Sequence, residues 1–198
     1  MFMRNIRIII EYDGTNYVGW QRQRGLLTVQ GALEDALRRL TCAPPDKEVK
    51  VNGASRTDAG VHAISQVGNF LTQSLSPARA MMNGLNFFTP DDIVIKEADD
   101  VPLDFDPRRH SKSKTYLYRI INHAHPSAIL RNFSWHVFQP LNVPRMREAA
   151  VDILGEKDFT SFCSAESDAE HAVREVTSFE IFERGNGIIE FEVKGRAF

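Results

Sequence analysis

The order of strand-like and helix-like segments constrains the fold of this chain most. Branched or aromatic runs bounded by turn residues predict strands, and apolar residues at helical spacing predict helices. The first half predicts a strand, a helix, two strands, a helix and a strand, over residues 6–12, 29–40, 49–54, 61–70, 77–85 and 93–95. The second half predicts a strand, a helix and a hairpin, over residues 114–122, 144–154, 173–183 and 188–194. This alternation favours the α+β class, with two halves that share an architecture.

Local signals support several of these elements. Thr28 stands where an N-cap is expected for the helix over residues 29–40. Gly185-Asn186-Gly187 is a strong turn signal between the last two predicted strands. We expect two α+β domains, residues 1–105 and 106–198, joined near residues 104–111.

Composition narrows the class of protein. The 198 residues are 42% hydrophobic and include nine prolines and twelve glycines, which excludes a disordered chain and a coiled coil. The two cysteines, Cys42 and Cys163, lie far apart and indicate neither a disulfide scaffold nor a cysteine-based zinc site. Charged residues interrupt the N-terminal apolar stretch, so it does not resemble a signal peptide, and no apolar run is long enough to span a bilayer. We therefore expect a soluble, cytoplasmic protein without a metal and without a membrane partner.

The net charge of −2 hides a basic segment. Residues 107–125 carry five basic side chains and no acid, with Tyr116 and Tyr118 among them. Basic residues interleaved with aromatic ones favour RNA binding, and a solvated basic strand edge is the alternative. Two further arginines lie close to Trp20 in the loop after the first strand. The candidate RNA-binding residues are Arg22, Arg24, Arg108, Arg109, Lys112 and Lys114.

A short polar loop, Ser55-Arg56-Thr57-Asp58-Ala59-Gly60, carries the candidate chemistry. It places a carboxylate between two predicted strands, two residues after an arginine. A nearby arginine can keep a carboxylate ionised and oriented, and an ionised aspartate can act as a nucleophile or a general base. The alternative is an Asp-Ala-Gly turn in which Asp58 caps its own backbone, and the residues alone favour that plain turn.

Five blocks of the sequence carry a resemblance to a known family. Residues 55–63 (SRTDAGVHA) resemble the family's G-R-T-D-A-G-V-H-A motif, with Ser55 in place of glycine. Residues 12–23 (YDGTNYVGWQRQ) are similar to its opening Y-D-G-x-x-[FY]-x-G-W-Q-x-Q. Its first helix, its second motif and its G-x-x-D-F-x-x-F segment are matched, in order, by residues 28–34, 105–119 and 155–163. By these blocks the chain is identified as a member of the TruA family of tRNA pseudouridine synthases, which modify the anticodon stem-loop.

The resemblance implies a fold and a reaction. The fold would be the pseudouridine synthase fold, with two RRM-like or ferredoxin-like α+β halves and a largely antiparallel mixed sheet flanked by helices. The enzyme would be an isomerase that acts on uridines 38, 39 and 40 of tRNA, breaking the N1–C1′ bond and joining C5 to C1′. Nothing is oxidised and no group is imported, so no cofactor is expected. Family members are homodimers that share one tRNA, and we expect a homodimer here.

The same resemblance implies roles for three residues. Asp58 would be the catalytic nucleophile, attacking C6 or C1′ or assisting departure of the uracil anion, and the sequence does not choose among these. Because the base must first leave the stack, at a cost of a few kcal/mol, Arg56 would fill the vacated space and pair with Asp58 or a phosphate. Tyr116 would stack on the uracil, which can contribute about 1–3 kcal/mol. The alternatives are a surface arginine that closes the loop and a tyrosine in the core.

Other functions explain fewer residues. Ser55, Asp58 and His62 lack the nucleophile elbow of a hydrolase triad, and His123 and His125 lack a partner at metal-ligand spacing. No G-x-x-x-x-G-K loop is present, which argues against an NTPase and a nucleotide cofactor. The competing function is a noncatalytic RNA-binding module, which would gain nothing from an acid that repels phosphate.

The last residues resemble the start of one more family segment. Residues 191–198 (FEVKGRAF) are similar to the beginning of F-x-[VI]-x-[GA]-x-x-F-L-x-x-M-V-R, whose final arginine pairs with the catalytic aspartate in the family. That arginine would fall just beyond Phe198. A domain that ends on an apolar strand leaves apolar surface uncovered, so we expect the natural chain to continue.

Overall fold

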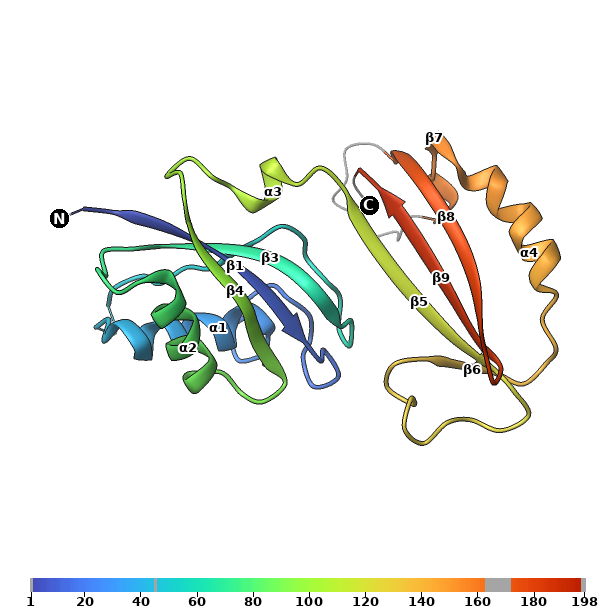
Figure 1. The fold of residues 1–198 in the computed structure, drawn as a ribbon, viewed down its shortest axis with the longest axis horizontal. Coiled ribbons are helices and arrows are strands. Elements are labelled where there is room, and N and C mark those ends of the chain that lie inside the picture. Colours follow the sequence, from blue (N-terminus) through green and yellow to red (C-terminus); the bar gives the residue numbers. More distant parts are fainter. Residues whose placement is uncertain (1, 45, 163–171, 197–198) are drawn as a thin grey trace. The chain divides into compact units, whose positions relative to one another are not determined.

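A computed structural model of the chain describes residues 2–44, 46–162 and 172–196. The chain divides into two compact units, an N-terminal unit of residues 1–111 and a C-terminal unit of residues 112–198. Each unit has its own sheet and its own helices (Figure 1). The predicted α+β class is confirmed. The proposed domain boundary between residues 105 and 106 lies just before the last helix of the N-terminal unit.

The N-terminal unit is built around a four-stranded antiparallel sheet with the strand order β2-β3-β1-β4. The chain order of β1–α1–β2–β3–α2–β4 is that of a ferredoxin-like unit. Its elements are β1 (Arg4–Tyr12), α1 (Val29–Thr41), β2 (Asn52–Gly53), β3 (Ala63–Thr72), α2 (Ala78–Phe88), β4 (Ile93–Val101) and α3 (Pro107–His110). The predicted strand over residues 49–54 is therefore shorter than expected, because β2 pairs with β3 at only two positions.

The core of this unit lies between one face of the sheet and the helices α1 and α2. Alternate side chains of β1, from Ile6 to Tyr12, are buried on that face, as the period of two in a strand requires. They pack with Leu33 of α1 and with Met81 of α2 in one hydrophobic cluster. The predicted N-cap of α1 is confirmed, because the Thr28 side chain accepts a hydrogen bond from the Gly31 N–H.

The C-terminal unit holds a five-stranded mixed sheet with the order β6-β5-β9-β8-β7. Only β5 and β6 run parallel among its pairs in the described part of the chain. Its elements are β5 (Lys114–Asn122), β6 (Trp135–Val137), α4 (Val143–Ala150), the 3-10 turn Val151–Ile153, β7 (Gly155–Asp158), the 3-10 turn Thr160–Phe162, β8 (Val173–Gly185) and β9 (Ile188–Gly195). The turn between β8 and β9 has positive φ at Gly185, Asn186 and Gly187, as the sequence predicted.

The two units repeat one arrangement of elements. In chain order, β5, α4, β8 and β9 correspond to β1, α1, β2 and β3, and the sheet order β8-β9-β5 corresponds to β2-β3-β1. One face of the second sheet buries Ile120, Ile181 and Phe191 against Val143 and Ala150 of α4. Among the described helices, none is long and apolar enough to cross a membrane.

Candidate active site

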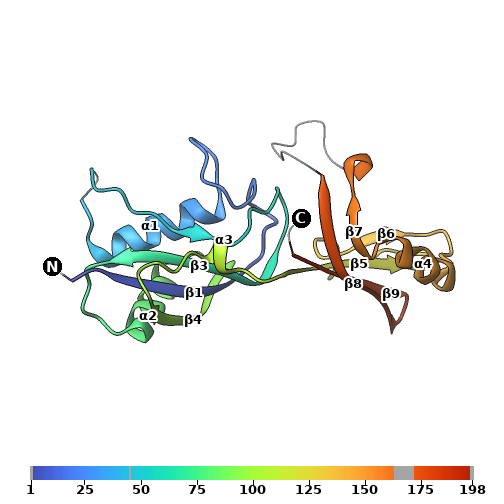
Figure 2. The ribbon, with the colours of Figure 1, turned by 90° about the horizontal axis from the view of Figure 1, so that it is seen from above.

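The loop that carries Asp58, residues 54–62, connects β2 to β3 and is held by the loop between β1 and α1, residues 13–28. Figures 1 and 2 show both loops at the same end of the four-stranded sheet. The Trp20 N–H donates to the Thr57 carbonyl at 2.9 Å, and the Gly60 N–H donates to the Tyr17 carbonyl at 3.1 Å. The Tyr12 hydroxyl lies 2.8 Å from the Thr57 hydroxyl. The backbone on both sides of Asp58 is therefore tied to the β1–α1 loop.

Glycines in the β1–α1 loop allow this close approach. A Cβ atom at Gly14 would collide with the Val61 carbonyl, and one at Gly19 would collide with the Thr57 carbonyl and lie 3.2 Å from the Asp58 carbonyl carbon. Gly19 also has a φ of +106°, which disfavours any side chain. Glycine is thus required at both positions by the packing of one loop against the other.

Polar groups at the end of the Asp58 loop and in the β1–α1 loop form hydrogen bonds and an ion pair. His62 Nδ1 lies 2.9 Å from the Asp13 carboxylate and 3.1 Å from the Gly14 nitrogen. Partial burial acts to raise the pKa of Asp13, but hydrogen bonds from Thr15 and the neighbouring His62 outweigh it, so the pKa is lowered. The Tyr17 hydroxyl donates to Asp92 at 2.6 Å, and burial together with this bond raises the pKa of Tyr17. These contacts fix the base of the loop.

The side chains of Asp58 and Arg56 are exposed at the surface of the N-terminal unit. Within the described residues, neither side chain has a hydrogen bond or an ion pair, so the two do not pair with each other. The turn after Asp58 is closed by its backbone, because the Val61 N–H donates to the Asp58 carbonyl at 3.2 Å. The carboxylate is thus not used to cap the turn, and it is open to a ligand.

The six candidate RNA-binding residues have different surroundings. Arg22 donates to Glu34 at 2.9 Å and lies 3.3 Å from Asp35, so its charge is already balanced within the protein. Lys114 opens β5 and is half-buried. The other four are exposed, and within the described part of the chain their side chains make no ion pair: Arg24, Arg108, Arg109 and Lys112.

The C-terminal unit carries the predicted stacking residue. The register of β5 against β9 places Tyr116 and Tyr118 on the same face of the strand, as the alternation predicted. Tyr116 is 37% exposed and Tyr118 is 55% exposed, so neither is a buried core residue. Tyr118 lies edge-on to Phe191, with ring centroids 6.5 Å apart. No group of three or more potential metal-ligating side chains occurs among the residues that the structure describes.

Sequence reasoning missed the residues that hold the Asp58 loop. Tyr12 and Trp20, both almost fully buried, contact it through a hydroxyl and a backbone N–H. Gly14 and Gly19 match the two glycines of the family pattern over residues 12–23. Two glycines on either side of an aromatic residue could have suggested that this loop packs closely against another. Gln30 and Glu34 are also buried, although polar residues on a helix read as surface.

The fold and this loop together define an α+β protein with a carboxylate exposed at one end of a ferredoxin-like unit. The family model described as tRNA pseudouridine synthase matches residues 8–108 and 149–198. The chain belongs to the tRNA pseudouridine synthase family.

Individual relatives agree with this assignment. The chain is 46% identical to tRNA pseudouridine synthase A of Acetivibrio thermocellus over 196 residues, which cover 99% of this chain and 78% of that protein. It is 44% identical to the protein of that name from Ruminiclostridium cellulolyticum, with the same coverage. Identity to the Myxococcus xanthus protein of that name is 42%, over 99% of this chain and 72% of that protein.

Proposed function

We propose that Asp58 is the catalytic carboxylate with which this tRNA pseudouridine synthase isomerises uridines 38, 39 and 40 of the anticodon stem-loop. Its family makes the protein an isomerase that acts on tRNA. The observation that carries the proposal is the state of Asp58: an exposed carboxylate with no partner within the described residues, on a loop whose backbone is held on both sides. Exposed aspartates are commonly unpaired, so what distinguishes Asp58 is the loop backbone that is held on both sides of it.

The reaction sets what this site must do. The N1–C1′ bond breaks, the uracil turns and C5 bonds to C1′. The proton on C5 is released and N1 takes up a proton, so atoms balance without a cofactor. Asp58 can take part by attacking C6, by attacking C1′, or by assisting departure of the uracil anion. All three routes need an ionised carboxylate held at a defined place beside the nucleotide.

Other residues are proposed to bind the RNA. The exposed guanidinium of Arg56 is available to pair with Asp58 or a phosphate once a base has been flipped out. Tyr116 is proposed to stack on the flipped uracil, and its partial exposure supports this role. The exposed cations Arg24, Arg108 and Lys112 are better placed to meet phosphates than Arg22, which is neutralised by Glu34.

Two further properties are proposed from the family resemblance. The protein would work as a homodimer that shares one tRNA between subunits, and it would act in the cytoplasm, where tRNA is processed. Sedimentation of the protein alone and with tRNA tests the first property.

Replacing the carboxylate tests the proposed function. Asp58→Asn keeps the size of the side chain and removes its charge, so pseudouridine formation should fall to background while tRNA binding survives. Tritium placed on uracil C5 and released into water reports turnover, and filter binding reports affinity. Asp91→Asn, at another exposed aspartate of the same unit, is the matched control and should react as the unchanged protein does. Turnover retained by the Asp58→Asn protein would refute the assignment.

A further inference from the structure

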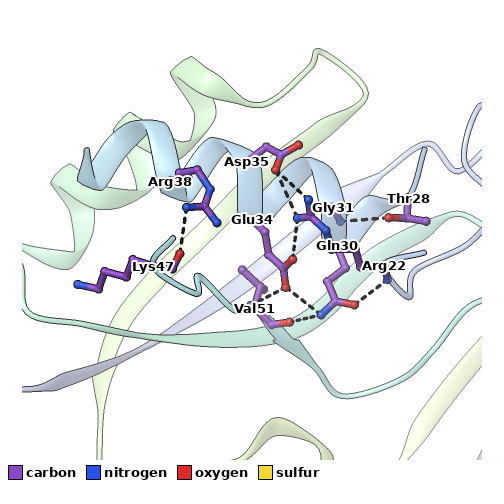
Figure 3. Close-up of polar contacts among 9 residues, drawn as sticks. All are labelled: Arg22, Thr28, Gln30, Gly31, Glu34, Asp35, Arg38, Lys47 and Val51. Atoms are coloured by element: carbon purple, nitrogen blue, oxygen red, sulfur yellow. Dashed lines mark hydrogen bonds and ion pairs between the residues drawn. The ribbon is translucent and has the colours of Figure 1, made fainter. Parts of the chain in front are cut away.

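Helix α1 carries a buried polar cluster that the reaction does not directly require (Figure 3). Gln30 and Glu34 are 6% and 5% exposed, and they lie one turn apart on the helix. One carboxylate oxygen of Glu34 accepts from Gln30 Nε2 at 3.0 Å and from the Val51 N–H at 3.2 Å. The other accepts from Arg22 at 2.9 Å. Gln30 in turn donates to the Val51 carbonyl at 2.9 Å and accepts from the Arg22 N–H at 2.9 Å.

The cluster fastens two segments that meet at the Asp58 loop. Arg22 belongs to the β1–α1 loop, and Val51 stands just before β2, which leads into the Asp58 loop. Both segments are held through backbone N–H groups, of Arg22 and of Val51. These bonds keep each segment close to α1 and also fix which part of the helix it lies against.

A short path of hydrogen bonds links the cluster to Asp58. The Gln30 N–H donates to the Trp20 carbonyl at 3.0 Å, and the Trp20 N–H donates to the Thr57 carbonyl at 2.9 Å. From the other side, Val51 leads through β2 to Gly53, which packs so closely on the Trp20 ring that an added Cβ would lie 2.6 Å from it. A shift of the β1–α1 loop against α1 would therefore move the residue before Asp58.

We propose that Glu34 and Gln30 are positioning residues for Asp58, which set the geometry of its loop through the β1–α1 loop and Val51. The inference rests on the proposed function of Asp58. A buried carboxylate is costly unless it is fully hydrogen-bonded, and apolar side chains would fill the same space without fixing a register. The donors around Glu34 come from both segments, so the carboxylate can fix the backbone of each one relative to α1.

Glu34→Gln is the principal test, made in the full chain. A glutamine keeps the shape but cannot accept from Arg22 on one side and from Gln30 and Val51 on the other, so one side must open. Because a misplacement of about 1 Å can cost on the order of a hundredfold in rate, single-turnover pseudouridine formation should fall ten- to a hundredfold. The dissociation constant for tRNA should stay within twofold, since no proposed RNA contact is removed.

Asp35→Asn is the matched control. Asp35 contacts the same arginine at 3.3 Å, but its side chain is 65% exposed and it holds neither Gln30 nor Val51. We expect its rate to stay within twofold of the unchanged protein. A parallel loss in both variants would assign the effect to the Arg22 charge and overturn the positioning role.

Hydrogen exchange supplies a readout that does not depend on catalysis. In the Glu34→Gln protein the Trp20 and Val51 amides should exchange faster, while the Leu85 amide of α2 should not change. Unchanged exchange at Trp20 and Val51 would overturn the proposal. Faster exchange with an unchanged rate of pseudouridine formation would also overturn it, as would an equal loss of that rate and of tRNA affinity. If Asp58→Asn left pseudouridine formation unchanged, the proposed function would be refuted instead. The exchange result for the loop would still stand.

A second variant covers failure to fold. Gln30→Met removes the amide at similar volume, and it should show the same slower reaction with faster exchange at Trp20. Should neither Glu34→Gln nor Gln30→Met unfold cooperatively, the cluster would be a requirement of the fold itself, and the proposal would be wrong.

Discussion

A methyl group at Gly19 tests how closely the β1–α1 loop holds the Asp58 loop. In Gly19→Ala the new Cβ would come closer than 3.0 Å to the Thr57 carbonyl oxygen, which real Cβ atoms do not do, and to 3.2 Å from the Asp58 carbonyl carbon. Ordinary contact begins at 3.4 Å, so the two loops must separate by about 1 Å. The backbone of Asp58 moves in that separation.

Two costs add in this variant. Overpacking costs about 1–3 kcal/mol, and an alanine at a φ of +106° costs about 1–3 kcal/mol more, so the free energy of unfolding should fall by about 2–6 kcal/mol. The displacement of about 1 Å should also slow pseudouridine formation by on the order of a hundredfold. Affinity for tRNA should change little, because no cation is removed.

Gly25→Ala separates strain from displacement. Gly25 lies in the same loop with a φ of +77°, but a Cβ there meets nothing within 4 Å. This variant should lose about 1–2 kcal/mol of stability and keep its rate. Chemical denaturation measures the stabilities, and single-turnover release of tritium from uracil C5 measures the rates. If Gly19→Ala reacted as fast as Gly25→Ala, the close packing of the two loops would not determine the position of Asp58, and the reasoning would be refuted.

Three further predictions concern the C-terminal unit, including the lysines at its start. Tyr116→Phe should keep much of the activity and Tyr116→Ala should lose it in the tritium assay, and equal rates in both variants would exclude stacking. Neutralising Lys112 and Lys114 together should weaken tRNA binding and reduce the slope of log affinity against log salt by up to about two units, whereas an unchanged slope would remove this segment from the RNA contact. Hydrogen bonds from Arg184 and Arg119 lower the pKa of Glu190 below its usual value of 4.5, so its contribution to stability is present above that value and is lost as the pH falls through the lowered pKa. Glu190→Gln should remove this part of the acid dependence in denaturation measured from pH 6 downward, and an identical profile would contradict it.

The local elements were predicted well because their signals are local. The residues of β5 were predicted at both ends, and α1 begins after its predicted cap, because apolar spacing and capping depend on near neighbours in the chain. The strand over residues 93–95 instead extends to Val101, since β1 supplies a pairing edge for polar residues that have little strand character of their own.

The family blocks in the sequence by themselves determined the reaction class and the loop that carries Asp58. They could not determine which residues hold that loop. In the sequence, Gln30 and Glu34 have the pattern of the polar side of an amphipathic helix, but in the fold both are buried and Glu34 bonds to Val51. Arg22 is a similar case: its pairing with Glu34 could not be predicted from the sequence, and its RNA contact stays a prediction. Burial and charge pairing are set by segments far apart in the chain, so only the tertiary structure decided them.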